Sequence, residues 1–295
     1  LARRAQGDVA GAIADYDRAI HFYPDGREKA TAYNNRGNAR CALGNLGGAI
    51  GDFEQAIELN PNDATAYYNR GNVSKAQGNL VLAIADYNRA IDLSPDDAIA
   101  FNNRGNTWQA LGDWEAAVGD YDRAITLSPQ TAMFYRNRGM ARQRQGEPAA
   151  AVADYDRAIA LFDEGPDRAA VYISLGQACM ELGDLEAALN AYDEAVLLDP
   201  WNAGAFGSRG NARYAQGDME GAMSDYDQAI ELNPDHAMAH YSRGTARRKR
   251  RETAGAIADF EKVLELEADP ALAKKARKQL AELRPDEATW GRWSL

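Results

Sequence analysis

The stretch Ala98–Thr131, which reads AIAFNNRGNTWQALGDWEAAVGDYDRAITLSPQT, decides how the chain folds. Its apolar residues recur at intervals of three and four, the spacing of one face of an α-helix. Gly112 and Asp113 interrupt the pattern, because a glycine ends one helix and an aspartate beside it caps the next. The 34 residues are therefore predicted to form two amphipathic helices joined by a tight turn. Neither helix buries its apolar face alone, so the unit needs neighbours built in the same way.

The rest of the chain supplies such neighbours. Starting at Gly37, a glycine of the first helix recurs after 34, 34, 34, 37, 34 and 34 residues, at Gly71, Gly105, Gly139, Gly176, Gly210 and Gly244. An aromatic residue of the second helix keeps step, at Tyr16, Phe53, Tyr87, Tyr121, Tyr155, Tyr192, Tyr226 and Phe260. Most copies close with a proline, at Pro24, Pro61, Pro95, Pro129, Pro200 and Pro234. The chain is thus an array of repeats, which overrides the estimate of about two globular domains that its length suggests.

The pattern resembles the tetratricopeptide repeat family, whose signature is an aromatic residue, Leu-Gly, and then Ala, an aromatic residue and Pro. The resemblance covers about Leu1–Ala268. It implies an all-α fold, a right-handed superhelical α-solenoid of stacked helix–turn–helix repeats. The residue before the glycine is usually Leu in the family, and here only Leu175 follows that pattern. Arginine takes the position in the other copies, at Arg36, Arg70, Arg104, Arg138, Arg209 and Arg243.

These arginines are matched by aspartates in the second helices. An aspartate follows the glycine by fifteen residues wherever the arginine is present, at Asp52, Asp86, Asp120, Asp154, Asp225 and Asp259. In the copy with Leu175, the same position is Ala191. This joint change predicts an Arg–Asp contact within each repeat and gives the arginines a structural role.

We expect four segments along the chain. Residues 1–26 form a truncated first repeat, 27–268 form seven repeats, 269–283 form a capping helix, and 284–295 form an irregular tail with Trp290 and Trp293. Near residues 24–30 and 163–169 the junctions are longer, and the three extra residues are expected to lengthen a loop. Because the chain starts inside a helix without an initiator Met, we interpret it as a fragment or processed form of a longer protein.

Composition narrows the classes of function. The net charge of −11 argues against nucleic acid as the main partner. No run of about twenty apolar residues occurs, so no membrane insertion is expected within this segment. The sequence does not fix the compartment, and a cytoplasmic location is favoured. Self-association through the ends of the array is compatible with the pattern.

Catalytic and cofactor motifs are absent from the sequence. His236 and His240 stand four apart on one helix face, a spacing that suits a metal, but no third ligand accompanies them and surface histidines are the preferred interpretation. The basic run Arg247–Arg251 is a candidate for docking an acidic partner, although a solvated helix end that complements the helix dipole is preferred. The sequence therefore predicts no enzyme, no cofactor and no metal.

The candidate binding residues are asparagines of the first helices. They lie two positions before the repeat glycine or one position after it, at Asn35, Asn69, Asn103, Asn137, Asn38, Asn72, Asn106 and Asn211. First helices line the concave groove in the resembling family, so the resemblance implies an inward-facing asparagine ladder. Each amide offers donors and an acceptor to a peptide unit, and specificity would come from Tyr68, Met133, Arg136 and Tyr214. The alternative is that the asparagines are solvated residues copied during duplication.

The sequence is thus interpreted as a protein–protein interaction scaffold that holds an extended segment of a protein or peptide partner in its concave groove. The sequence of its repeats is similar to that of bacterial repeat proteins, cyanobacterial ones among them. Two alternatives stay open: a regulatory or substrate-recognition arm of a larger enzyme, and a purely structural array without a ligand. One repeat stands out, because Gly204 and Gly207 leave the inner face of its first helix unusually bare.

Overall fold

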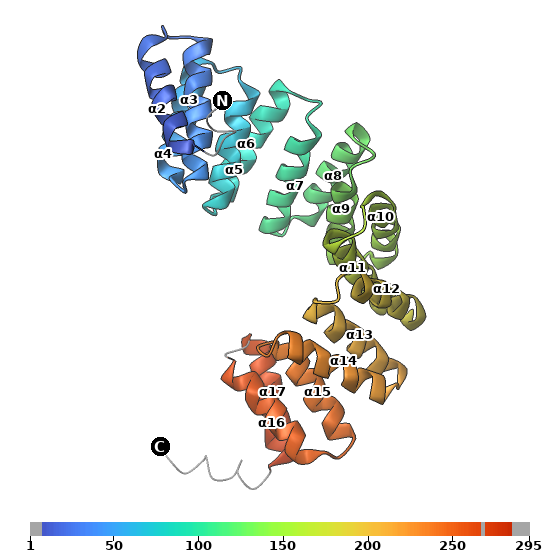
Figure 1. Cartoon of the computed structure of the whole chain (residues 1–295). Coiled ribbons are helices and arrows are strands. Elements are labelled where there is room, and N and C mark those ends of the chain that lie inside the picture. Colours follow the sequence, from blue (N-terminus) through green and yellow to red (C-terminus); the bar gives the residue numbers. More distant parts are fainter. Residues whose placement is uncertain (1–7, 267–268, 285–295) are drawn as a thin grey trace. The chain divides into compact units, whose positions relative to one another are not determined.

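The computed structural model describes residues 8–266 and 269–284 (Figure 1). Within these residues the regular elements are sixteen α-helices, which confirms the all-α repeat fold. The start of the truncated repeat, residues 1–7, and the tryptophans Trp290 and Trp293 lie outside the described residues. None of the described helices is both long and apolar enough to cross a bilayer.

The chain divides into two compact units, Leu1–Gly146 and Glu147–Leu295. The helices of the first unit are α2 (Val9–Phe22), α3 (Arg27–Ala42), α4 (Leu46–Leu59), α5 (Ala64–Ala76), α6 (Leu80–Leu93), α7 (Ala98–Leu111), α8 (Trp114–Leu127) and α9 (Ala132–Arg144). Those of the second unit are α10 (Pro148–Leu161), α11 (Pro166–Leu182), α12 (Leu185–Leu198), α13 (Ala203–Gln216), α14 (Met219–Leu232), α15 (Ala237–Lys249), α16 (Thr253–Glu265) and α17 (Pro270–Leu283). In each unit a helix packs against the helices next to it in the sequence.

The turn inside the repeat has the predicted chemistry. Gly112 follows α7 with φ +81°, a left-handed conformation that glycine adopts without strain. Asp113 then caps α8, because its Oδ1 accepts a hydrogen bond from the Ala116 N–H at 3.0 Å. Two adjacent residues therefore end one helix and begin the next, as expected.

The repeat glycine is needed where the two helices of a repeat meet. Tyr121 on α8 is fully buried, and a Cβ placed on Gly105 of α7 would lie only 2.8 Å from its Cε1. The core of this repeat adds Ala117 and, from the next first helix, Ala141. A small residue at each contact allows the aromatic ring to fill the space between helices.

The predicted Arg–Asp contacts are present wherever one unit contains both residues. The guanidinium of Arg104 on α7 donates to both carboxylate oxygens of Asp120 on α8, at 2.8 and 2.6 Å. The same pairs form at Arg36–Asp52, Arg70–Asp86, Arg209–Asp225 and Arg243–Asp259. These aspartates are buried, so each ion pair connects the two helices of its repeat at their buried interface.

The longer junctions differ from the expectation. Four residues, 23–26, separate α2 from α3, and four residues, 60–63, separate α4 from α5, so no loop is lengthened. The extra residues extend the first helix instead: α3 has 16 residues and α11 has 17, against 13 in α5. Gly26 and Gly165 precede these two helices with nearly equal φ values of +145° and +144°. The loop prediction was therefore wrong, because the added residues continue the α-helix and make its backbone hydrogen bonds.

Helix α17 covers the end of the array. Leu272 and Ala276 are buried against Phe260 and Val263 of α16. The helix is also tied by charge, since Arg248 of α15 lies 2.7 Å from Glu282. Its apolar side thus occupies the position that a further repeat would take.

Candidate functional site

First helices of successive repeats contact one another directly. In the first unit these contacts join α3 to α5, α5 to α7 and α7 to α9; in the second they join α11 to α13 and α13 to α15. The first helices of each unit therefore form a continuous layer, which we call its first-helix wall. The candidate asparagines all lie on this wall.

Three of the four asparagines before the glycine, Asn69, Asn103 and Asn137, connect adjacent first helices. Asn69 Nδ2 donates to Asn34 Oδ1 at 3.0 Å, and Asn137 Nδ2 donates to Asn102 Oδ1 at 2.9 Å. Asn103 Nδ2 donates to the Tyr68 hydroxyl at 2.8 Å. The ladder is thus a set of hydrogen bonds between repeats. Asn103 and Asn137 each donate a second bond to the neighbouring helix, to Asn72 Oδ1 at 3.2 Å and to Asn106 Oδ1 at 3.3 Å, so their NH₂ groups already hold neighbouring helices together.

Asn34 and Asn102 were missed by the sequence reasoning. Both are buried, with exposed fractions of 7% and 1%. Each stands directly before a candidate asparagine in the sequence, and the Asn-Asn doublets Asn34–Asn35 and Asn102–Asn103 were the available signal. The first member of each doublet accepts the bond from the next repeat.

The asparagines after the glycine are oriented by tyrosines. The Oδ1 atoms of Asn72, Asn106 and Asn211 accept from the hydroxyls of Tyr87, Tyr121 and Tyr226 at 2.7, 2.7 and 3.0 Å. Burial raises the pKa of all three tyrosines above their ordinary value, so the hydroxyls remain donors. With the oxygen occupied, the amide NH₂ groups are the part left to face a ligand.

Asn35 and Asn38 differ from the rest of the ladder. Both are half-buried on α3, and neither side chain hydrogen-bonds to another residue in the part of the chain that the structure describes. Asn38 lines a pocket of about 460 Å³ between α3 and α5, with Asn69 and Asn72. Its other walls are Cys41, Ala42, Leu46, Val73 and Ala76. This pocket brings three of the predicted binding residues together.

Lys75 is a further residue that the sequence reasoning did not single out. It is half-buried near the end of α5, next to the pocket residue Ala76. Desolvation by burial lowers the pKa of its amine, and no ion pair to it occurs among residues 8–266 and 269–284. Lys75 is not among the residues that line the pocket.

The remaining candidates are distributed over both units. The ring centres of Tyr68 and Tyr87 lie 6.0 Å apart, and Met133 packs against the buried cluster that contains Phe134. Arg136 is half-buried on α9. In the second unit, Asn211 and Tyr214 lie on α13, and the Lys249 ammonium is 5.0 Å from the centre of the Tyr214 ring.

The histidines and the basic run have structural roles. His236 caps α15, its Nδ1 accepting from the Ala239 N–H at 3.2 Å. His240 is buried, with Nε2 2.9 Å from the Pro234 carbonyl oxygen. Arg247 pairs with Asp259 at 2.8 Å. No cluster of three or more metal-ligating side chains occurs among the residues that the structure describes.

Comparisons with known proteins agree with the repeat pattern. A model described as TPR repeat matches residues 37–78, 71–112, 176–217 and 210–249, and two models described as tetratricopeptide repeat match residues 130–196 and 98–130. A search of the curated proteins gives no match.

Among solved structures, YrrB, described as a TPR protein with an unusual peptide-binding site, is 26% identical with a TM-score of 0.54, over 63% of this chain and 95% of YrrB. The MamA protein is 25% identical with a TM-score of 0.53, over 59% of this chain and 93% of MamA. A tetratricopeptide repeat protein from Parabacteroides merdae is 18% identical with a TM-score of 0.68, over 84% of this chain and 97% of its own. The chain therefore belongs to the tetratricopeptide repeat family.

Proposed function

We propose that the chain is a protein-interaction scaffold that binds an extended segment of a partner protein along the first helices of its first unit. The observation that carries this proposal is the pocket between α3 and α5, where Asn38, Asn69 and Asn72 meet. The binding residues proposed with it are the asparagines of the first unit, Asn35, Asn38, Asn69, Asn72, Asn103, Asn106 and Asn137, together with Tyr68 and Arg136; the other two candidates, Asn211 and Tyr214, lie on α13 of the second unit. YrrB, similar in fold and sequence, is described as having a peptide-binding site.

The chemistry of the pocket favours peptide carbonyl groups. The Asn72 oxygen accepts from both Tyr87 and Asn103, so its NH₂ group is the part available to a ligand. Asn38 adds an amide whose oxygen and NH₂ group make no hydrogen bond to another side chain among the residues that the structure describes. An extended segment exposes a carbonyl and an N–H in every peptide unit, and the donors on this wall match its carbonyls.

The hydrogen bonds within the ladder decide which variants test the proposal. Replacing Asn69, Asn103 and Asn137 together would remove bonds between repeats and change stability along with binding. Asn35 and Asn38 make no such bonds to the residues that the structure describes, so Asn35→Ala and Asn38→Ala separate the two effects. Asn190, an exposed asparagine on α12, provides the matched control.

The test selects binders from a library of short linear peptides on the full chain and measures their affinity by calorimetry. The Asn35→Ala/Asn38→Ala double variant is expected to weaken a selected peptide about tenfold to hundredfold, the effect of two net hydrogen bonds. Its thermal melt should match that of the unmodified chain, and Asn190→Ala should bind normally. Unchanged affinity in the double variant, or a library that yields no binder, would contradict the proposal and favour a purely structural array.

A further inference from the structure

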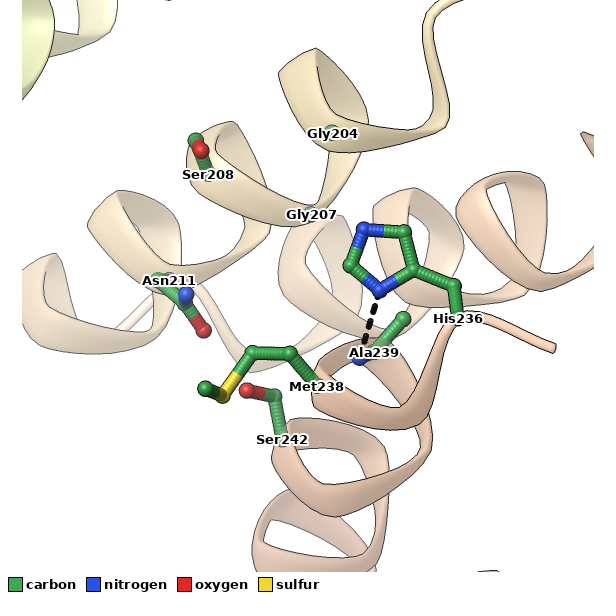
Figure 2. A pocket seen from close by; sticks show the side chains of 8 residues that line it. All are labelled: Gly204, Gly207, Ser208, Asn211, His236, Met238, Ala239 and Ser242. Carbon is green, nitrogen blue, oxygen red and sulfur yellow. Dashed lines mark hydrogen bonds between the residues drawn. The ribbon is translucent and has the colours of Figure 1, made fainter. Parts of the chain in front are cut away.

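A second hollow lies in the second unit, between the first helices α13 and α15. It has a volume of about 130 Å³ and is lined by Gly204, Gly207, Ser208, Asn211, His236, Met238, Ala239 and Ser242. Figure 2 shows the His236 ring beside the bare backbone at Gly207, and the Met238 side chain extending toward Asn211 and Ser242. All of these residues belong to one unit, and none of them lines the pocket of the first unit.

The hollow exists because α13 has lost side chains that the other first helices carry. The position of Gly207, three residues before the repeat glycine, is occupied elsewhere by Asn34, Tyr68, Asn102, Arg136, Ile173 and Tyr241. The position of Gly204 is occupied by Thr31, Thr65, Ile99, Met133, Ala170 and Met238. Ser208 and Ser242 stand where the first four full repeats have asparagine. Small residues thus replace larger ones at three positions on one helix face.

Packing within the protein does not require Gly207. A Cβ added there would meet only the His236 ring, at 3.9 Å, which is ordinary van der Waals contact. At Gly210, on the same helix, a Cβ would lie 2.7 Å from Tyr226 Cε1. Gly207 also lacks the positive φ that would demand glycine. A glycine inside a helix makes the helix less stable than an alanine would. We attribute the presence of Gly207 to the space that it leaves open in the hollow.

Two hydrogen-bond donors, on His236 and Asn211, line the hollow. His236 Nδ1 accepts from the Ala239 N–H, so the neutral ring carries its proton on Nε2, the atom that lies 3.9 Å from a Cβ placed on Gly207. Asn211 Oδ1 accepts from the Tyr226 hydroxyl at 3.0 Å, which leaves the Asn211 NH₂ group as a donor. Asn211 is exposed, so a ligand reaches this group from solvent.

We propose that this hollow is a binding subsite for a single tyrosine side chain of a partner protein. Its volume is close to the cavity of about 150 Å³ that is known to accept benzene. A planar aromatic ring suits a hollow whose α13 side consists mainly of small residues such as Gly204 and Ser208, and the Met238 thioether would provide a favourable sulfur–aromatic contact. The tyrosine hydroxyl then accepts from His236 Nε2–H or from the Asn211 NH₂ group. The subsite stands apart from the proposed peptide groove of the first unit and does not depend on it.

The experiment uses the full chain with ¹³C-methyl-labelled methionine, which gives one signal for each of its six methionines. N-acetyl-tyrosinamide, N-acetyl-phenylalaninamide and N-acetyl-leucinamide are titrated separately, and Met238→Leu identifies the reporter signal. The tyrosine probe is expected to shift the Met238 methyl upfield by ring current, with a Kd on the order of a millimolar. The phenylalanine probe should bind about twofold to tenfold more weakly because it lacks one hydrogen bond.

Three variants complete the design. Gly207→Tyr restores the side chain found at Tyr68 and Tyr241 and should abolish the response, and Gly207→Ala should weaken it severalfold. His236→Asp retains a helix cap, because its carboxylate accepts from the Ala239 N–H, but it carries no hydrogen-bond donor, so it should reduce the preference for the tyrosine probe over the phenylalanine probe. Gly119→Ala is the matched control and should respond normally, because Gly119 is an exposed position of α8 where an added Cβ meets none of the described residues within 4 Å.

The outcomes are separable. If Gly207→Tyr does not fold, Gly207→Ala decides the question, since its added methyl makes only ordinary contact. A Met238 signal that is indifferent to the tyrosine probe, or equal binding of the leucine probe, overturns the assignment of the subsite. A response in Gly207→Ala equal to that of the unmodified chain does the same.

Discussion

Arg104 and Asp120 join the two helices of one repeat through a two-bonded ion pair in which the carboxylate is buried and the guanidinium is partly exposed. The remaining guanidinium nitrogen of Arg104, Nη1, donates to Asn88 of the preceding repeat at 2.6 Å. One arginine therefore connects two repeats. The copy with Leu175 and Ala191 replaces the whole pair by apolar residues, which leaves no buried charge behind.

Removing one partner of this pair should destabilise the chain more than removing both. Arg104→Leu leaves the Asp120 carboxylate buried without its cation, and we expect a loss of about 2–4 kcal/mol. The double variant Arg104→Leu/Asp120→Ala copies the natural Leu175–Ala191 pair and should recover part of that loss. Thermal and denaturant unfolding of the two single variants and the double variant measures this. Additive losses would show that the pair is not coupled.

Two glycines of one repeat should respond to alanine in opposite directions. Gly105→Ala places a Cβ 2.8 Å from Tyr121 Cε1 and should lower the free energy of unfolding by about 1–3 kcal/mol. Gly119→Ala, on the exposed side of α8 with nothing within 4 Å, should raise it by about 0.5–1 kcal/mol. Urea unfolding of both variants provides the comparison. Equal effects of the two substitutions would count against the close-approach argument.

Much of the fold could be predicted because the same residue types recur at equivalent positions in several repeats. The Gly-Asp turn, the glycine opposite the aromatic ring and the Arg–Asp pair all depend on residues within one repeat. The joint change to Leu175 and Ala191 identified a contact without any coordinates. Only the placement of the three extra residues failed, since α3 and α11 took them up as an added helical turn.

The candidate site was harder to predict because it depends on how neighbouring repeats are rotated against each other. The bond from Asn137 to Asn102 joins residues 35 apart, and that from Asn103 to Asn72 joins residues 31 apart. No periodicity distinguishes an amide that faces solvent from one that faces the next repeat. The bare face at Gly204 and Gly207 was visible in the sequence, whereas the donor on His236 required the cap geometry.

Asn137 should contribute to stability, unlike Asn38. Asn137 is buried and donates to Asn102 Oδ1, so Asn137→Ala leaves a buried acceptor without its donor. We expect a loss of about 1–3 kcal/mol. Asn38→Ala removes no side-chain hydrogen bond within the described part of the chain, and its free energy of unfolding should stay within about 0.5 kcal/mol of that of the unmodified chain. Parallel chemical denaturation tests this difference, and similar losses for both variants would refute it.

The buried tyrosines should make the fold sensitive to alkali. Burial raises the pKa of Tyr121 above the ordinary value of 10.0, so the folded state holds the hydroxyl proton more tightly than the unfolded chain does. Its contribution is therefore complete below pH 10 and is lost as the pH rises above that value. Tyr121→Phe should show a shallower loss of stability above pH 10 than the unmodified chain, measured by urea unfolding at stepped pH. Parallel pH profiles for the two proteins would exclude this tyrosine as a cause.

The last prediction concerns the capping helix α17. Truncation after Leu266 removes Leu272 and Ala276 and exposes the buried side chains of Phe260 and Val263. Burying such apolar surface is worth about 25 cal/mol per Å², so the truncated chain should self-associate and melt at a lower temperature. Leu272→Ala in the full chain should reproduce part of the effect, with a loss of about 2–4 kcal/mol. Truncation after Arg284 retains α17 and is the matched control. Sedimentation velocity and thermal melts of the three variants decide the matter: if the chain that ends at Leu266 stays monomeric and melts like the control, α17 does not act as a cap.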